Sequence, residues 1–420
     1  MYELELQKKK TNQKTLIITV CTLVCFPPIV LFVNMLCSAI FGPDFSMDTL
    51  ACYFFAACMI LFSLKELHFR IKIDALLIYV VFILAYIISY AFFEANRRYL
   101  VTEWDDFASN PVYLLFVFSL PAYVFMRYIN DYERLYKTFF YFALIVVFCS
   151  LGTFVLMLVD DDQPEYMSFS YNLLFSIIFL AIYFFEKKNV LALLAAILGI
   201  GMILFAGARG PLVCFLAALV AYLMLKKDSS VKKIIVLIFL GIAILIIALF
   251  WEQILLMLSD FATELGVSSR TIELLLNGEF SSDSGRWEIQ KKIIDGFTPL
   301  GKGLFGDRVL GENHYAHNLI IELISQWGYF LGTIIVVGLG VLFVNGFRTK
   351  DKTAQLIILT LFTSSILKLM LSNSYLSHNS SFFVLIAVCV NSIENPSGKV
   401  DDAGEDPPTF QSRYIKTRIR

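Results

Sequence analysis

Long apolar segments alternate with polar connections along this chain, and one connection is far longer than the others. A helix needs about 17–25 apolar residues to cross a bilayer. We place about twelve such spans. They cover residues 16–36, 47–64, 73–93, 111–126, 138–159, 169–185, 189–206, 211–225, 233–251, 318–345, 354–372 and 380–393. The pattern predicts an all-α polytopic membrane protein with one large external loop that contains amphipathic helices.

Composition supports this fold class. Of the 420 residues, 58% are hydrophobic and only 16% are charged, whereas about a quarter of the residues in a soluble domain are charged. The eight Cys residues lie in or at the ends of apolar runs without a CxxC pair, which favours core positions over metal or redox sites. The run 16–36 is too long for the apolar h-region of a signal peptide and no convincing cleavage site follows it, so we interpret it as a retained first span.

The placement of charge predicts the orientation. Lys and Arg gather in alternate connections, whereas the intervening connections are acidic, as at Asp160–Asp162. Because basic connections stay on the cytoplasmic side, we expect both termini to be cytoplasmic. The expected organisation is a cytoplasmic N-terminus (1–15), nine spans (16–251), an outer loop (252–317), three spans (318–393) and a disordered cytoplasmic tail (394–420).

A helix break precedes the eighth span. Gly207, Gly210 and Pro211 interrupt the apolar pattern around Arg209, and Pro211 suits the first position of a new helix. Free backbone N–H groups at a helix N-terminus, next to an arginine, form a natural seat for phosphate. A tight helical hairpin with a snorkelling Arg209 explains the same pattern equally well.

The outer loop contains two further features. Arg286 precedes an amphipathic run, Trp287–Phe297, which we expect to lie on the outer membrane surface with its apolar face down. Asp283 or Ser284 is suited to cap this helix. Arg286 opposes the helix dipole, which favours a ligand-binding role for its side chain. The glycine-rich segment 301–306 matches no nucleotide-binding fingerprint, and we expect a flexible connection there.

Four polar residues recur at helical spacing where the loop re-enters the membrane: His314, Asn318, Glu322 and Gln326. A helix beginning near residue 313 would align them in one stripe. A carboxylate at membrane depth is costly unless it is paired. Lys368 lies at a matching depth, so we predict an intramembrane pair between Glu322 and Lys368. The alternative is that Lys368 snorkels outward and Glu322 reaches water.

His317 lies at the boundary between loop and span. A histidine there is suited to act as a base near neutral pH, although a lone histidine is more often a simple interfacial residue. We find no HExxH, GxSxG or acidic metal-binding motif typical of soluble enzymes.

The order of these features resembles the O-antigen ligase/polymerase family of bacterial envelope enzymes. An external Gly-Ala-Arg-Gly break is followed by Ser284-Gly285-Arg286, the glycine-rich turn, and His317-Asn318 before an apolar helix. The resemblance implies a GT-C-like, metal-independent glycosyltransferase without a cofactor, in the bacterial plasma (inner) membrane. Its donor and acceptor would be glycans linked to undecaprenyl pyrophosphate.

The resemblance also implies roles for individual residues. Arg209 and Arg286 match the arginines that hold the pyrophosphate, and His317 matches the histidine that activates the acceptor hydroxyl. The further substrate-binding candidates are Gly210, His314, Asn318, Glu322 and Lys368. Arg209 is preceded by Ala206-Gly207-Ala208, where many members of the family have Ser or Thr near the arginine, so no hydroxyl is available there.

Three functions fit the sequence. The leading hypothesis is polymerisation of repeat units into O-antigen or capsular polysaccharide, and the second is ligation of finished glycan to lipid A-core. The third is transport of a lipid-linked sugar. Transporters usually place broken helices near the midplane, whereas the polar residues here gather at the outer face. Membrane lipids and a chain-length regulator are the expected partners, and no nucleic acid is expected.

Overall fold

The computed structural model describes residues 2–42, 47–67, 72–102, 111–159, 166–206, 209–226, 253, 256–257, 260, 285–377 and 379–395. These residues form helices and connecting turns, without a strand among them. The predicted all-α fold is therefore confirmed.

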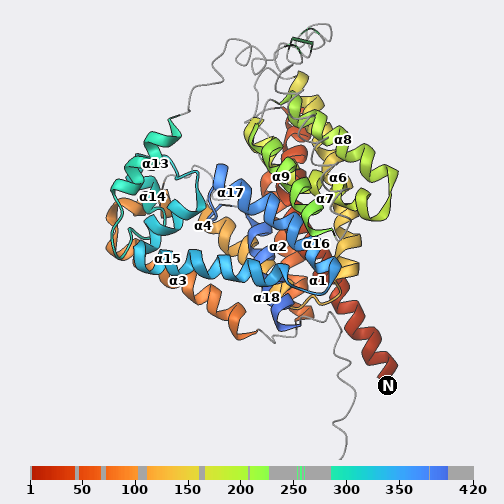
Figure 1. Cartoon of the computed structure of the whole chain (residues 1–420), viewed down its shortest axis with the longest axis horizontal. Coiled ribbons are helices and arrows are strands. Elements are labelled where there is room, and N and C mark those ends of the chain that lie inside the picture. Colours follow the sequence, from red (N-terminus) through yellow and green to blue (C-terminus); the bar gives the residue numbers. More distant parts are fainter. Residues whose placement is uncertain are drawn as a thin grey trace, which may run out of the picture.

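The helices are named as in Figure 1. The α-helices of the first part are α1 (Tyr2–Phe41), α2 (Met47–Glu66), α3 (Ile73–Phe92), α4 (Pro111–Leu114), α5 (Leu120–Met126), α6 (Tyr132–Val159), α7 (Tyr166–Lys187), α8 (Val190–Phe205) and α9 (Arg209–Leu225). Those of the second part are α13 (Arg286–Asp295), α14 (Gly306–Leu310), α15 (Leu319–Phe347), α16 (Lys352–Leu361), α17 (Leu367–Leu371) and α18 (Ser380–Glu394). A short 3₁₀ turn, η1 (Glu94–Asn96), and three π-helical turns, η2 (Arg98–Thr102), η4 (Leu115–Ser119) and η6 (Phe362–Ile366), complete the set.

Six of the described helical segments are long and apolar enough to cross a membrane. They are Gln13–Phe41, Ile73–Phe92, Tyr132–Met157, Met167–Lys187, Leu319–Phe347 and Lys352–Leu371. Four shorter apolar helices, Val112–Met126, Val190–Leu204, Gly210–Leu225 and Ser380–Glu394, coincide with further predicted spans. The predicted span 233–251 lies outside the described residues, so the count of twelve and the GT-C assignment remain predictions.

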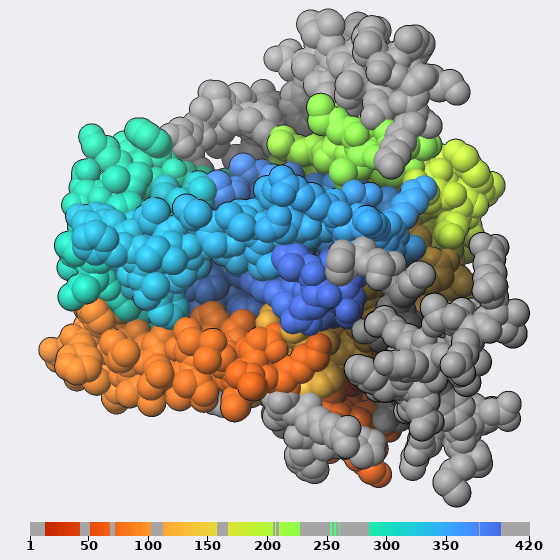
Figure 2. Space-filling model, turned by 60° about the horizontal axis from the view of Figure 1, so that its bottom comes forward, coloured from red at the N-terminus to blue at the C-terminus, as the bar shows by residue number. Residues whose placement is uncertain are grey.

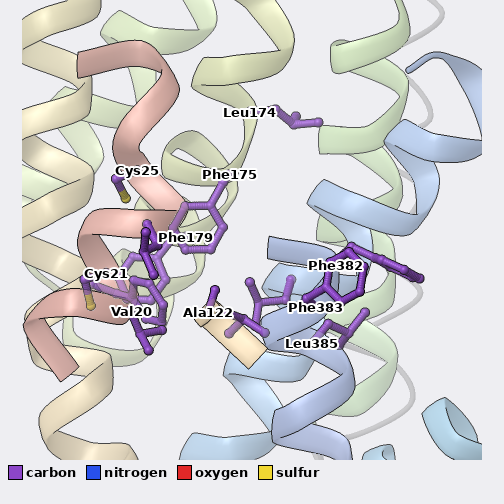
Figure 3. Close-up of a cluster of buried hydrophobic side chains, with 14 of the residues drawn as sticks. Val20, Cys21, Cys25, Ala122, Leu174, Phe175, Phe179, Phe382, Phe383 and Leu385 are labelled. Atoms are coloured by element: carbon purple, nitrogen blue, oxygen red, sulfur yellow. The ribbon is translucent and has the colours of Figure 1, made fainter. Parts of the chain in front are cut away.

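The core lies where α1, α6 and α7 meet α5 and α18. Figure 3 shows part of it, with Cys21 and Cys25 of α1, Phe179 of α7 and Phe383 of α18. The rings of Tyr136 and Phe179 are 4.9 Å apart between centroids, a distance typical of favourable aromatic pairs. Both cysteines are buried and free, as expected for core residues.

Arg127, in the turn after α5, joins three helices at one end of the bundle. Its buried guanidinium donates from Nε to Asp74 of α3 at 2.5 Å and from Nη2 to Glu394 of α18 at 2.7 Å, and it also contacts Asn391 of α18. A buried arginine is tolerated because both carboxylates and the amide satisfy its donors. This is the end that the charge pattern predicts to be cytoplasmic.

The long helix α15 is interrupted at Gly328, which has φ 80° and ψ 169°. The freed carbonyls accept backbone hydrogen bonds from the preceding loop. Lys302 N donates to Ser325 O at 2.9 Å, and Gly303 N donates to Gln326 O at 3.0 Å. Broken helices are tolerated at membrane depth only where the freed backbone groups find such partners.

The loop that fills this break, residues 298–306, is referred to below as the docked loop. Asn96 donates from Nδ2 to Lys302 O at 2.6 Å and to Leu304 O at 2.8 Å, and Leu304 N donates to Ser89 Oγ at 2.7 Å. Leu304 and Phe305 are buried. The expected flexible connection at 301–306 is therefore wrong, because the sequence pattern did not reveal the broken helix that the loop completes.

The docked loop forms hydrogen bonds with both α15 and the α3–η1 region, and α15 and α3 run side by side across one face of the molecule. In Figure 2, α15 is light blue and α3 is orange, and a hollow lies between these two helices. The α13–α14 region lies at one end of both helices. The loop bonds to the break in α15 on one side and to Ser89 and Asn96 on the other. It thereby fixes the position of α13 and α14 relative to the bundle.

Substitution Gly328→Ala tests this anchoring. An added Cβ would overlap Pro299 O, and the positive φ disfavours a side chain, so we expect a loss of about 1–3 kcal/mol of stability. Thermal unfolding of the purified protein measures the effect. Gly338→Ala, in the same helix with open space around it, is the matched control and is expected to leave the melting temperature unchanged or raised. Equal melting temperatures for the two variants would contradict the anchoring role.

Candidate functional site

Several helix ends gather at one end of the bundle. α7 begins at Tyr166, α9 begins at Arg209, and α17 ends at Leu371. Figure 1 shows α17 between α13 and α9. Arg286, the first residue of α13, donates from Nη1 to Leu371 O at 3.1 Å, and its Nη2 lies 3.7 Å from Met167 Sδ of α7. Arg286 therefore reaches from the predicted outer loop to α7 and α17.

His317 lies in the turn just before α15, with a positive φ of 50°. Its neighbour Ala316 is held from both sides: Ala316 N donates to Asp307 Oδ2 at 3.2 Å, and Ala316 O accepts from Gln290 Nε2 at 3.2 Å. The imidazole packs on Tyr315, with 3.8 Å between ring centroids. His317 Nδ1 is buried without a hydrogen-bond partner among the described residues, a state that favours a ligand contact.

The environment of His317 keeps its imidazole neutral. Burial, the positive charge of Arg286 and the nearby His314 together lower the pKa of His317 to about 4. Both burial and like charge disfavour the imidazolium form. At neutral pH, the ring therefore has an unprotonated nitrogen that can accept a proton. The influence of Arg286 also places these two predicted residues within electrostatic range of each other.

Tyr171 of α7 lies close to two further predicted residues, Gly210 and Lys368. A Cβ built on Gly210 would overlap the Tyr171 hydroxyl, so the first turn of α9 lies directly against this ring. The ammonium of Lys368 is 5.8 Å from the Tyr171 ring centroid. Arg286 is also within electrostatic range of Tyr171. The structure thus brings Gly210, Lys368 and Arg286 together around one tyrosine.

Arg209 is the first residue of α9 and precedes Gly210 in this cluster. The predicted helix break is confirmed between Phe205 and Arg209. The new helix begins two residues earlier than Pro211, the expected first position. The side chain of Arg209 lies outside the described parts of the chain, so its predicted contact with pyrophosphate remains a prediction.

Glu322 and Gln326 belong to a separate buried network. Gln326 Nε2 donates to Asp307 Oδ1 at 2.9 Å, and Tyr375 OH donates to Gln326 Oε1 at 2.6 Å. Ser374 Oγ and Tyr375 N donate to the Glu322 carboxylate. Burial raises the pKa of the Asp307 carboxyl. This network joins α14, α15 and the turn before α18, so it holds the loop that carries His317.

The predicted ion pair between Glu322 and Lys368 is not formed in the described structure. Glu322 is engaged by Ser374 and Tyr375, whereas Lys368 faces Tyr171. The two residues were matched by depth, but depth does not determine the direction in which a helical side chain points. The π-helical turn η6 immediately precedes α17 and shifts the helical register there.

The predicted stripe begins at Asn318 rather than at His314. Asn318 caps α15, since its Oδ1 accepts from Ile320 N at 3.0 Å and from Ile321 N at 3.3 Å. His314 lies outside the helix and is exposed. The side-chain oxygen of Asn318 thus serves the helix N-terminus, where four backbone N–H groups lack partners.

The amphipathic helix of the outer loop, α13, is shifted and differently packed. It spans Arg286–Asp295. Gly285 occupies the N-cap position and has no side chain that could accept a capping hydrogen bond. Asp283 and Ser284, the predicted caps, lie outside the described residues. Ile293 is buried, whereas Trp287 and Ile294 are exposed. The predicted apolar face is therefore divided between the protein and the surroundings.

Sequence reasoning missed Tyr171, Asp307 and Tyr315. Tyr171 lies in the polar opening of an apolar span, next to Ser168 and Ser170. Asp307 directly follows the glycine-rich segment 301–306 and precedes Arg308. The available signals were therefore the polar residues at the start of an apolar span and the carboxylate after the glycine-rich segment. In the part of the chain that the structure describes, no group of three or more His, Cys, Asp or Glu is placed to hold a metal ion.

Residues 191–337 match the family model described as O-Antigen ligase, which covers about a third of the chain. The matched region contains Arg209, Arg286 and His317, whereas Tyr171 and Lys368 lie outside it. The match confirms the resemblance to the O-antigen ligase/polymerase family. Together with the apolar helices, it indicates a multi-pass membrane protein with a glycan-processing function. Comparisons with curated proteins and with solved structures found no match.

Proposed function

We propose that this protein is a membrane glycosyltransferase of the bacterial inner membrane. It polymerises oligosaccharide repeat units linked to undecaprenyl pyrophosphate into O-antigen or capsular polysaccharide, at the outer leaflet. One observation carries the proposal: Arg286 contacts the end of α17 and lies within electrostatic range of both His317 and Tyr171, and the first turn of α9 packs against Tyr171. These residues are far apart in the sequence. The family match over the same residues supports it.

The reaction needs two kinds of group, and the site offers both. The acceptor hydroxyl oxygen bonds to the anomeric carbon of the donor sugar, and the bond from that carbon to the pyrophosphate oxygen breaks. The hydroxyl proton passes to His317, and undecaprenyl pyrophosphate leaves with the electron pair. The leaving group gains negative charge in the transition state, where the Arg286 guanidinium, together with the predicted contribution of Arg209, stabilises it.

Donor binding prepares His317 for this role. In the free site, burial and the charge of Arg286 hold the pKa of His317 near 4, which makes it a weak base. A bound pyrophosphate offsets the charge of Arg286 and raises that pKa. Base strength therefore increases when the donor is in place, and a base is most effective when its pKa lies near the working pH.

Substitutions Arg209→Ala, Arg286→Ala and His317→Ala in cells test the proposal. We expect normal expression with loss of polymer and accumulation of single repeat units on the outer leaflet, because units are flipped but not joined. Analysis of extracted lipid-linked intermediates measures this. Arg348→Ala, at the opposite end of α15, is the control and should leave polymer unchanged. Accumulation on the inner leaflet would indicate a flippase, and unchanged polymer in all three variants would refute the assigned site.

The dependence of the rate on pH tests the role of His317. Protonation of the base abolishes catalysis, so each acidic limb reports the pKa of His317 in one state of the enzyme. We expect kcat/KM, which reports the free enzyme, to fall only near pH 4. The acidic limb of kcat should lie at higher pH because the bound pyrophosphate offsets Arg286. A steady-state assay across pH gives both limbs, and coincident limbs would contradict the proposed coupling.

Ligation is the second candidate, because the matched family model is described as O-Antigen ligase. Purified protein supplied with lipid-linked repeat units, but without lipid A-core, separates the two reactions. Chain growth under these conditions would exclude the ligase function. If transfer occurs only after lipid A-core is added, the protein is a ligase rather than a polymerase. The proposed donor site would be the same in both cases.

A further inference from the structure

Lys368 is a buried cation without a counterion among the described residues. Its side chain is 9% exposed, and among the described residues no carboxylate contributes to the electrostatic environment of its ammonium. The carboxylate that depth matching assigned to it, Glu322, is held by Ser374 and Tyr375. Burial of an unpaired charge opposes folding, and a bound anion would stabilise this lysine.

The surroundings of Lys368 are built from three helices. Tyr171 of α7 presents its ring to the ammonium at 5.8 Å, within the range of a cation–π contact. Cys214 of α9 lies within electrostatic range, and Gly210, one turn earlier in α9, leaves room for the Tyr171 hydroxyl. The π-helical turn η6 directly precedes α17, and such turns are frequent at functional sites.

Lys368 and Arg286 lie at different depths along one helix. The guanidinium of Arg286 donates to the carbonyl of Leu371, the last residue of α17. Lys368 precedes Leu371 by about one helical turn toward the interior of the span. Two cations at successive depths suit two linked phosphates, of which the phosphate esterified to the lipid lies deeper in the membrane interface.

We propose that Lys368 and Tyr171 form an inner phosphate subsite that binds the lipid-esterified phosphate of the polyprenyl pyrophosphate. Arg286 then binds the phosphate nearer the sugar. The ammonium supplies the charge, and the Tyr171 hydroxyl donates a hydrogen bond to the same phosphate. This inference rests on the proposed function and deepens it. An ordinary phospholipid offers a similar phosphate, so the experiment must distinguish the two sources.

Binding of undecaprenyl monophosphate and undecaprenyl pyrophosphate to the purified full-length protein tests the subsite, for example by native mass spectrometry. The monophosphate carries only the lipid-side phosphate. We expect Lys368→Met to weaken binding of both ligands by about tenfold or more, the effect of a lost charge-assisted hydrogen bond. Arg286→Met should weaken binding of the pyrophosphate but spare the monophosphate. Lys368→Arg, which keeps the charge, should restore most of the binding.

A stability measurement separates a binding role from a structural one. Because Lys368 is buried without a counterion among the described residues, Lys368→Met should unfold at the same temperature as the wild type or higher. A structural lysine would instead give a lower melting temperature. Tyr171→Phe keeps the ring and should reduce binding less than Lys368→Met does.

The outcomes distinguish the subsite from the proposed function. If the wild type binds the pyrophosphate and Arg286→Met weakens it, while Lys368→Met binds both ligands normally, the subsite is wrong and the proposed function stands. If the wild type binds neither ligand, the subsite and the proposed function are both contradicted. Competition by phosphatidylglycerol as strong as that by undecaprenyl monophosphate would assign the subsite to phospholipid and overturn the proposal.

Discussion

The site depends on the backbone hydrogen bonds that the docked loop forms at the break in α15. α15 loses its regular hydrogen bonding at Gly328, and in an apolar environment unpaired backbone groups are costly. The docked loop supplies the missing partners through Lys302 N and Gly303 N. Since the same loop leads into α14 and on to His317, the backbone bonds at the break set the position of the proposed base.

A second constraint is the separation of charges. The buried carboxylates Asp307 and Glu322 are occupied by Gln326, Ser374 and backbone N–H groups. Their hydrogen bonds serve the position of the His317 loop. Among the described residues, in contrast, Arg286 contacts a helix end and Lys368 faces a tyrosine rather than a carboxylate. This arrangement leaves positive charge available at one end of the bundle, as the proposed anionic donor would require.

Hydropathy and motif order predicted the helical class, the break before α9 and the family resemblance. Each of these depends on residues that can be recognised locally in the sequence, such as apolar runs, Gly and Pro residues, and short motifs. The direction of side chains left no such trace. Depth alone paired Glu322 with Lys368, but η6 and the turn at residues 373–376 point them to different partners. Likewise, glycines at 301 and 303 indicated flexibility, although their positive φ values serve a packed turn against α15. Tyr171 was missed because a tyrosine in a span is usually a packing residue.

The most direct test of the central claim is photo-crosslinking of the lipid-linked donor from a residue beside the proposed clamp. A photoreactive phenylalanine analogue in place of Trp287, which adjoins Arg286 and is 63% exposed, would be compared with the same analogue at Val190, also 63% exposed. Val190 begins α8 and so lies at the opposite end of that helix from the α9 break. The account predicts crosslinks to undecaprenyl-linked glycan from position 287 and not from position 190. Equal crosslinking from both positions, or crosslinking only from position 190, would contradict it.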